Sequence, residues 1–217
     1  LQCIKDTIKN INIVIGCSIG CSYCYARMNN NRFHTIDDFN KPIFFENKLK
    51  MLDNKRHSAY LLTGQSDLSG WNEEWKDKVF SKMKENENTQ YIFLTKRPEN
   101  INLKETPDNG WFGVTVTSSK EKTRIDYLRN NIKAKHYHIT FEPMFDDVGK
   151  LDLSNISWIV IGTETGNRKR KISSKREWVF NIYNQAKEKN IPIFMKEDLL
   201  GILNEDEFVQ EFPKEFG

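Results

Sequence analysis

Short apolar runs rich in β-branched and aromatic residues recur along the chain, and longer polar segments separate them. These runs cover residues 11–15, 59–63, 91–95, 111–117, 137–141, 158–161 and 191–195. Most are nearly continuous rather than alternating, which is typical of parallel strands that are covered on both faces. We therefore expect these runs to form one buried sheet.

The segments between the runs carry apolar residues at helical spacing. Residues 72–87 begin with an asparagine cap and place Trp75, Val79 and Met83 on one face. Residues 120–131 and 175–190 carry similar stripes, and residues 199–212 are expected to form a closing helix. The first crossover, residues 25–58, is long enough to hold two helices.

Strand and helix thus alternate six or seven times, which argues for right-handed βαβ units and a parallel α/β sheet. Two architectures satisfy this pattern: an open doubly wound sheet, and a partial (βα)6 TIM-like barrel with a seventh strand. The chain has no internal repeat and no low-complexity linker. Residues 1–217 are therefore expected to form a single domain, with a core at about 11–196 and a C-terminal helix at about 199–212.

The composition places few limits on partners but several on location. The net charge of +3 is too small by itself to establish an anionic partner. No apolar run approaches the ~20 residues that a membrane span needs. The first residues, LQCIKDTIKN, lack the basic-then-apolar pattern of a secretory signal. We expect a cytoplasmic protein with reduced cysteines.

Three cysteines provide the clearest chemical feature of the sequence. Cys17, Cys21 and Cys24 lie in the run GCSIGCSYCYA with the spacing C-x3-C-x2-C, and Tyr23 directly precedes the last of them. Iron–sulfur clusters are normally bound by four cysteines. Three thiolates this close can bind three irons of a four-iron cluster and leave the fourth iron open to an outside ligand.

Zinc is the main alternative for these thiols. A structural zinc site needs four protein ligands, and the nearby fourth candidate is His34. Cys3 lies fourteen residues before Cys17 and is expected to be an ordinary half-buried thiol. Disulfides are not expected in a chain without a secretory signal. A non-catalytic zinc or iron–sulfur binding module therefore stays open.

The cysteine spacing and the aromatic residue before the last cysteine resemble the signature of the radical S-adenosylmethionine (SAM) superfamily. The later runs SDL, LTKRP, GVTV, FEP and GTETG follow in the order of a phage- and prophage-associated radical SAM family. The resemblance covers about residues 13–196. Two departures are Gly70-Trp71 after SDLS, and EPM in place of EPL.

This resemblance implies an enzyme and favours the partial barrel over the open sheet. Cys17, Cys21 and Cys24 would bind a [4Fe-4S] cluster, and SAM would bind the open iron. Reductive cleavage of SAM would then generate a 5′-deoxyadenosyl radical that abstracts hydrogen from a substrate. A one-electron donor such as flavodoxin or ferredoxin is the implied partner.

Polar residues follow nearly every predicted strand at its carboxyl end, where parallel βα folds gather their ligand sites. The resemblance implies that the second-strand loop, with Gly64, Gln65, Ser66 and the adjacent Asp67, presents backbone groups to the SAM amino group. For the SAM carboxylate we expect Lys96, with Arg97 as second choice. The remaining expectations are Tyr23 beside the adenine or the cluster, Thr115 and Thr117 for the ribose hydroxyls, Glu142 and Glu164 for ribose or substrate, and Glu142, Glu164 and Lys196 as catalytic candidates.

Six cationic residues follow the sixth strand within nine positions: Arg168, Lys169, Arg170, Lys171, Lys175 and Arg176. Such density favours a phosphate-bearing substrate, namely DNA, RNA or a nucleotide. A solvated loop before a helix would explain these residues equally well. A peptide-modifying radical SAM enzyme is the second enzymatic hypothesis, although Cys3 alone leaves no room for a second cluster.

Overall fold

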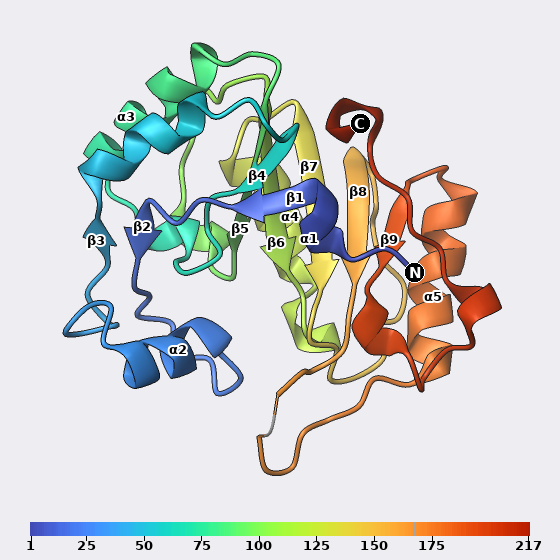
Figure 1. The fold of residues 1–217 in the computed structure, drawn as a ribbon. Helices are drawn as coiled ribbons and strands as arrows, with labels where there is room; N and C mark the ends of the chain where they lie inside the picture. Colours follow the sequence, from blue (N-terminus) through green and yellow to red (C-terminus); the bar gives the residue numbers. More distant parts are fainter. Residues whose placement is uncertain (167) are drawn as a thin grey trace.

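Seven parallel strands form one sheet that curls into a half-barrel, as the computed structural model shows (Figure 1). The structure describes residues 1–166 and 168–217. The strand order is β1-β4-β5-β6-β7-β8-β9, which agrees with the expected partial TIM-like barrel. The strands of this sheet are β1 (Ile8–Asn10), β4 (Ala59–Leu61), β5 (Gln90–Thr95), β6 (Gly110–Thr115), β7 (His136–Phe141), β8 (Ile156–Ile161) and β9 (Ile193–Met195).

The first predicted strand, residues 11–15, is wrong as a member of this sheet. The sheet begins with β1, and the chain then turns away so that β2 (Val14–Ile15) pairs antiparallel with β3 (Ile43–Phe44). Apolar content could not distinguish the two arrangements, because Val14 and Ile15 are buried in a second, two-stranded sheet. In Figure 1 this small sheet and α2 (Tyr25–Phe33) lie to one side of the half-barrel.

The three amphipathic segments form helices as predicted, with ends displaced by a few residues. They are α3 (Glu73–Lys84), α4 (Thr123–Asn131) and α5 (Arg176–Glu188), and α1 (Ile4–Thr7) is a short addition. Asn72 caps α3, because its side chain accepts a hydrogen bond from the Trp75 N–H at 2.9 Å. The first crossover contains α2 and a 3-10 helix at Glu46–Asp53.

The expected closing helix at residues 199–212 is wrong. This part of the chain forms short 3-10 turns at Glu197–Leu199 and Glu205–Glu207, followed by an antiparallel bridge between Gln210 and Phe194. Gly201 has a φ of +87°, which interrupts helical geometry. The segment is extended because it carries aromatic side chains to the concave face of the sheet.

These side chains complete an aromatic floor, which we define as Trp111, Trp158, Phe194, Phe212 and Phe216. The Phe216 ring lies 4.7 Å from Trp111 and 5.3 Å from Trp158, measured between ring centroids. The Trp158 indole N–H also donates to the Glu211 carbonyl at 3.0 Å. The floor fills the concave face toward the amino ends of the strands.

The opposite face of the sheet packs against the helices. In β8, Trp158 belongs to the floor, whereas Ile159 belongs to the cluster that includes Val179 and Ile182 of α5. Alternate residues of one strand thus reach two apolar layers, which explains the nearly continuous apolar runs. Open space remains at the carboxyl ends of the strands.

Among the residues that the structure describes, none of the helices has the length and apolarity to cross a membrane.

Candidate functional site

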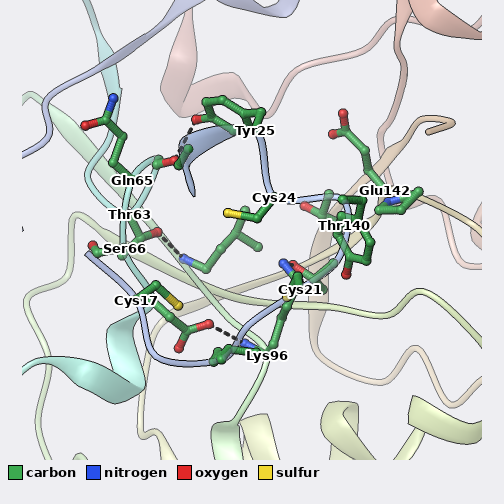
Figure 2. Close-up of a pocket in the computed structure, with 18 of the residues that line it drawn as sticks. Cys17, Cys21, Cys24, Tyr25, Thr63, Gln65, Ser66, Lys96, Thr140 and Glu142 are labelled. Atoms are coloured by element: carbon green, nitrogen blue, oxygen red, sulfur yellow. Dashed lines mark hydrogen bonds between the residues drawn. The ribbon is translucent and has the colours of Figure 1, made fainter. Parts of the chain in front are cut away.

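A cavity of about 290 Å³ lies at the carboxyl ends of the strands, between the cysteine loop, α2 and the strand-end loops (Figure 2). This volume is near the lower end of the range for small-molecule sites. Most of the predicted site residues share this cavity. Its lining includes Cys17, Cys21, Tyr23, Cys24, Tyr25, Met28, Gly64, Gln65, Ser66, Asp67, Lys96, Thr115, Thr140, Glu142 and Glu164.

The cysteine loop is anchored to the loop after β4. The Gly16 N–H donates to the Gln65 carbonyl at 3.0 Å, and the Cys17 N–H donates to the Phe39 carbonyl at 2.6 Å. Gly16 has a φ of +116°, and a Cβ there would lie 2.8 Å from the Cα of Pro42. Only glycine fits this close approach without displacement, so the position of Cys17 depends on it.

The three cysteines are free, half-buried thiols around the same cavity (Figure 2). Cys24 caps α2, and its sulfur accepts from the Arg27 N–H at 3.4 Å. Burial raises the pKa of Cys17.

In the described parts of the chain, no three His, Cys, Asp or Glu side chains converge as they would around one metal ion. This arrangement does not favour a single zinc ion. Each cysteine of a four-iron cluster binds a different iron, so such ligands stand further apart than those of one ion. The three thiols are the donor set that the sequence predicts, and they lie on one loop beside the cavity.

Lys96 brings a cation to the cavity. Its ammonium donates to the Thr115 hydroxyl at 3.4 Å and lies 5.8 Å from the centre of the Tyr23 ring. Tyr23 in turn packs edge-on against Phe145 at 5.4 Å. Burial, followed by the neighbouring Cys21, raises the pKa of Tyr23. Within the described residues Lys96 has no carboxylate within 4.0 Å, so it can bind an anionic group.

Asp67 holds Lys96 in place rather than facing a ligand. Its carboxylate accepts from the Thr95 hydroxyl at 2.6 Å and from the Lys96 backbone N–H at 2.8 Å. The Ser66 hydroxyl is also engaged, because it accepts from the Trp71 indole N–H at 3.0 Å. Gly64, Gln65 and Ser66 therefore offer mainly backbone groups to the cavity.

Tyr25 lines the cavity, although the sequence analysis predicted no role for it. Its hydroxyl donates to the Gly64 carbonyl at 2.6 Å, although the residue as a whole is half exposed. Burial of the hydroxyl, with Cys24 and Glu142 nearby, raises the pKa of Tyr25. Its position directly after Cys24 is the feature of the sequence that could have identified Tyr25 as a site residue.

Glu142 belongs to an ionic group on the far side of the cavity (Figure 2). Lys196 ion-pairs with Glu142, and its ammonium lies 3.3 Å from the Asp198 carboxylate. Asp198 also accepts from the Thr163 N–H at 3.0 Å. Burial raises the pKa of Asp198, while the two carboxylates raise the pKa of Lys196 despite its burial. Lys196 therefore contacts the cavity through Glu142.

Glu164 forms an ion pair with Arg168. Its two oxygens accept from Nε and an Nη of Arg168 at 2.5 and 2.7 Å, and the Ile172 N–H adds a third contact at 3.3 Å. The hydrogen bonds from Arg168 are the main cause of a lowered Glu164 pKa. The expected contact with ribose is not favoured by this arrangement, since Glu164 orients Arg168 instead.

Besides Lys196, two predicted residues, Arg97 and Thr117, lie outside the cavity lining. Arg97 is exposed to solvent. Thr117 is buried, but its hydroxyl and N–H donate to Glu121 at 2.7 and 2.8 Å. Both residues follow strand ends as predicted, but the chain turns their side chains away from the cavity.

Fold and site together define a mixed α/β half-barrel protein with a cysteine-lined cavity at the carboxyl ends of its strands. The chain belongs to the family described as "Protein of unknown function (DUF5131)", whose model matches residues 2–217. The comparisons gave no match to a curated protein or to a solved structure.

Proposed function

We propose that this protein is a radical SAM enzyme. The observation that carries the proposal is that Cys17, Cys21 and Cys24 line one cavity together with a glycine-containing strand-end loop and the cation of Lys96. When bound, a [4Fe-4S] cluster would supply one electron to SAM, which breaks the C5′–S bond and yields a 5′-deoxyadenosyl radical.

The chain's own residues would bind and orient the cosubstrate. The Lys96 ammonium, steadied by Asp67 through the backbone, would hold the SAM carboxylate. The backbone carbonyls of Gly64 and Gln65 would accept from its amino group. Thr115, beside Lys96, would donate to a ribose hydroxyl. Tyr23 would exclude water from the cluster.

Glu142 and Lys196 would serve the substrate rather than the cluster. The Lys196 ammonium pairs with the Glu142 carboxylate at the cavity edge, where that carboxylate can accept a hydrogen bond. Glu142 suits a substrate that presents hydroxyl, amino or amide hydrogens.

The proposal also requires a reducing compartment, for which we propose the cytoplasm, and a one-electron donor such as flavodoxin or ferredoxin. A peptide-modifying enzyme is the second candidate for the same chemistry. Its usual additional clusters have no counterpart here, because Cys3 stands apart with its thiol 3.1 Å from Glu197.

The test is anaerobic reconstitution with iron and sulfide, followed by reduction in the presence of SAM. We expect about four irons and four sulfides per chain, and release of 5′-deoxyadenosine. Cys21→Ala should lose both, whereas Cys3→Ala is the matched control and should keep both. A colourless protein with one zinc per chain, or SAM cleavage that survives in Cys21→Ala, would refute the proposal.

A further inference from the structure

The loop after β8 carries a cluster of cations at the mouth of the cavity. Glu164, Thr165 and Gly166 line the cavity, and the chain then extends beyond the carboxyl ends of the strands (Figure 1). We call Arg168, Lys169, Arg170 and Lys171 the basic rim. Lys169, Arg170 and Lys171 are exposed, so their charges face solvent beside the opening.

Arg168 is held by a buried partner. The Glu164 side chain is 2% exposed, whereas the Arg168 side chain is 30% exposed. Glu164 fixes one edge of the guanidinium through two hydrogen bonds, which leaves other N–H donors of Arg168 for a ligand. The buried carboxylate thus presents an oriented cation at the opening.

The loop is anchored again at its far end. The buried Ser174 donates its N–H to the Thr163 hydroxyl at 3.0 Å, and the Ile172 N–H donates to Glu164 at 3.3 Å. The cations therefore sit on a segment that is attached to the cavity wall on both sides.

The rim also carries positive charge that carboxylates do not balance. Within the described residues, Lys169, Arg170 and Lys171 have no Asp or Glu partner within 4.0 Å. Arg176 differs, because it is paired with Glu207. Three adjacent unpaired cations beside an oriented arginine attract a ligand with several negative charges.

Apolar side chains face the same opening from α2. Tyr25 and Met28 line the cavity and are 51% and 50% exposed. In Figure 1, α2 and the loop after β8 both lie in the lower part of the view, with α2 to the left of the sheet. An exposed aromatic ring and a basic segment that border the same cavity are the combination that binds stacked bases and their phosphates.

We propose that the basic rim binds the phosphates of a single-stranded nucleic acid whose base reaches the cavity opening beside Tyr25. This inference rests on the proposed function, for which it names the substrate class. A single strand suits the site better than a duplex, because a paired base must first leave its stack, which costs free energy, before it can reach the opening. A polymer fits better than a mononucleotide, because the cations extend beyond the opening.

The test measures binding of fluorescently labelled single-stranded DNA and RNA 20-mers by anisotropy across a series of salt concentrations. The variant Lys169→Gln/Arg170→Gln/Lys171→Gln removes three rim charges. The matched control, Lys55→Gln/Lys84→Gln/Lys133→Gln, removes three exposed charges before the amino ends of β4, β5 and β7.

We expect the rim variant to bind at least about tenfold more weakly, and its log–log salt slope to be shallower by about 2. The control should match the wild type. Arg168→Lys should keep the salt slope, whereas Arg168→Gln should reduce it by about 0.7. Tyr25→Ala should weaken binding about fivefold or more without changing the slope.

Several results would overturn the inference. They are no binding of either 20-mer by the wild type, equal losses in the rim variant and the control, tighter binding of duplex than of single strands, and binding of a mononucleotide as tight as that of the 20-mers. Iron and sulfide content of the same preparations tests the proposed function separately. Normal binding without a cluster would reject only the enzyme, and a cluster without binding would reject only this substrate class.

Discussion

The Tyr25 hydroxyl donates a hydrogen bond of 2.6 Å to the backbone carbonyl of Gly64. This contact joins the helix that follows the cysteines to the strand-end loop that is proposed to receive the SAM amino group. A side chain thus already donates to this carbonyl, and a ligand ammonium would have to share the oxygen with the phenol.

Tyr25→Phe removes this competitor and keeps the ring. We expect SAM to bind the reconstituted variant roughly 2- to 10-fold more tightly, because a net hydrogen bond contributes about 0.5–1.5 kcal/mol. Equilibrium dialysis with labelled SAM measures the change. Tyr127→Phe, an exposed tyrosine on α4, is the control. Weaker SAM binding in Tyr25→Phe would show that the hydroxyl supports the site instead.

Two glycine variants distinguish the effect of moving the cysteine loop from the effect of making it less flexible. Gly16→Ala places a Cβ 2.8 Å from the Pro42 backbone at a φ of +116°, whereas Gly20 has a φ of +78° and open space around it. We expect Gly16→Ala to lower the free energy of unfolding by about 2–4 kcal/mol and Gly20→Ala by about 1 kcal/mol.

Reconstitution distinguishes these two variants further. Gly16→Ala should bind less iron than the wild type, since the displaced backbone carries Cys17, and Gly20→Ala should bind the normal amount. Iron assays and urea denaturation are the measurements. Equal iron content in both variants would contradict the view that Gly16 positions Cys17.

Lys196→Met tests the ionic group beside Glu142. The variant leaves Glu142 and Asp198 without their shared cation. We therefore expect the free energy of unfolding to fall by roughly 2–4 kcal/mol at pH 7. Without the cation, the folded-state pKa of Asp198, already raised by burial, should rise further. A carboxyl with a raised folded-state pKa destabilises the fold above that pKa, and the cost disappears as protonation neutralises it.

The difference in stability between wild type and Lys196→Met should therefore shrink as the pH falls from 7 toward 4. Urea denaturation at several pH values measures this difference. Lys189→Met, an exposed lysine after α5, should show little effect at any pH. A difference that stays constant with pH would exclude an uncompensated carboxylate as its cause.

His138 should make stability depend on pH in a separate way. Its ring is buried, and Nε2 lies 3.0 Å from the Phe93 carbonyl, to which it donates. Burial lowers the pKa of His138 to about 4, against 6.5 for an unperturbed histidine. The unfolded chain therefore takes up the proton first as the pH falls.

The contribution of His138 to the free energy of unfolding is fully present above pH 6.5. It declines by roughly 3 kcal/mol in total as the pH falls to about 4. His138→Gln should remove this decline, at the cost of lower stability at pH 7. His34→Asn, at an exposed position, should retain it. Urea denaturation at pH 7, 6 and 5 measures the three curves, and an unchanged decline in His138→Gln would assign it to other groups.

The sequence predicted the sheet well because six strands contain continuous apolar runs that serve both layers of the fold, as Trp158 and Ile159 do in β8. It failed at residues 11–15, because Val14 is buried as well against β3 as it would be in the large sheet. The prediction of a helix at residues 199–212 also failed. Tertiary packing of the aromatic floor determines the conformation of this segment, despite the helical spacing of its apolar residues.

For the site, strand-end position was enough to predict that Lys96, Thr115 and Glu142 share a cavity. It could not predict which polar side chains turn inward. Glu164 reaches the cavity wall but is neutralised by Arg168, and Thr117 turns to Glu121. Such pairings depend on loop conformation, which the spacing of residues in the sequence does not encode.

The aromatic floor fills the half-barrel toward the amino ends of its strands, away from the cavity lining. Its residues Phe216, Trp111 and Trp158 are almost fully buried. We therefore expect the thiols to be reached from the carboxyl ends of the strands, where Tyr25 of α2 and Gly166 of the loop after β8 line the same cavity. For the proposed enzyme, substrate, product and oxygen would then share this approach, so residues that bind substrate tightly there would also slow turnover.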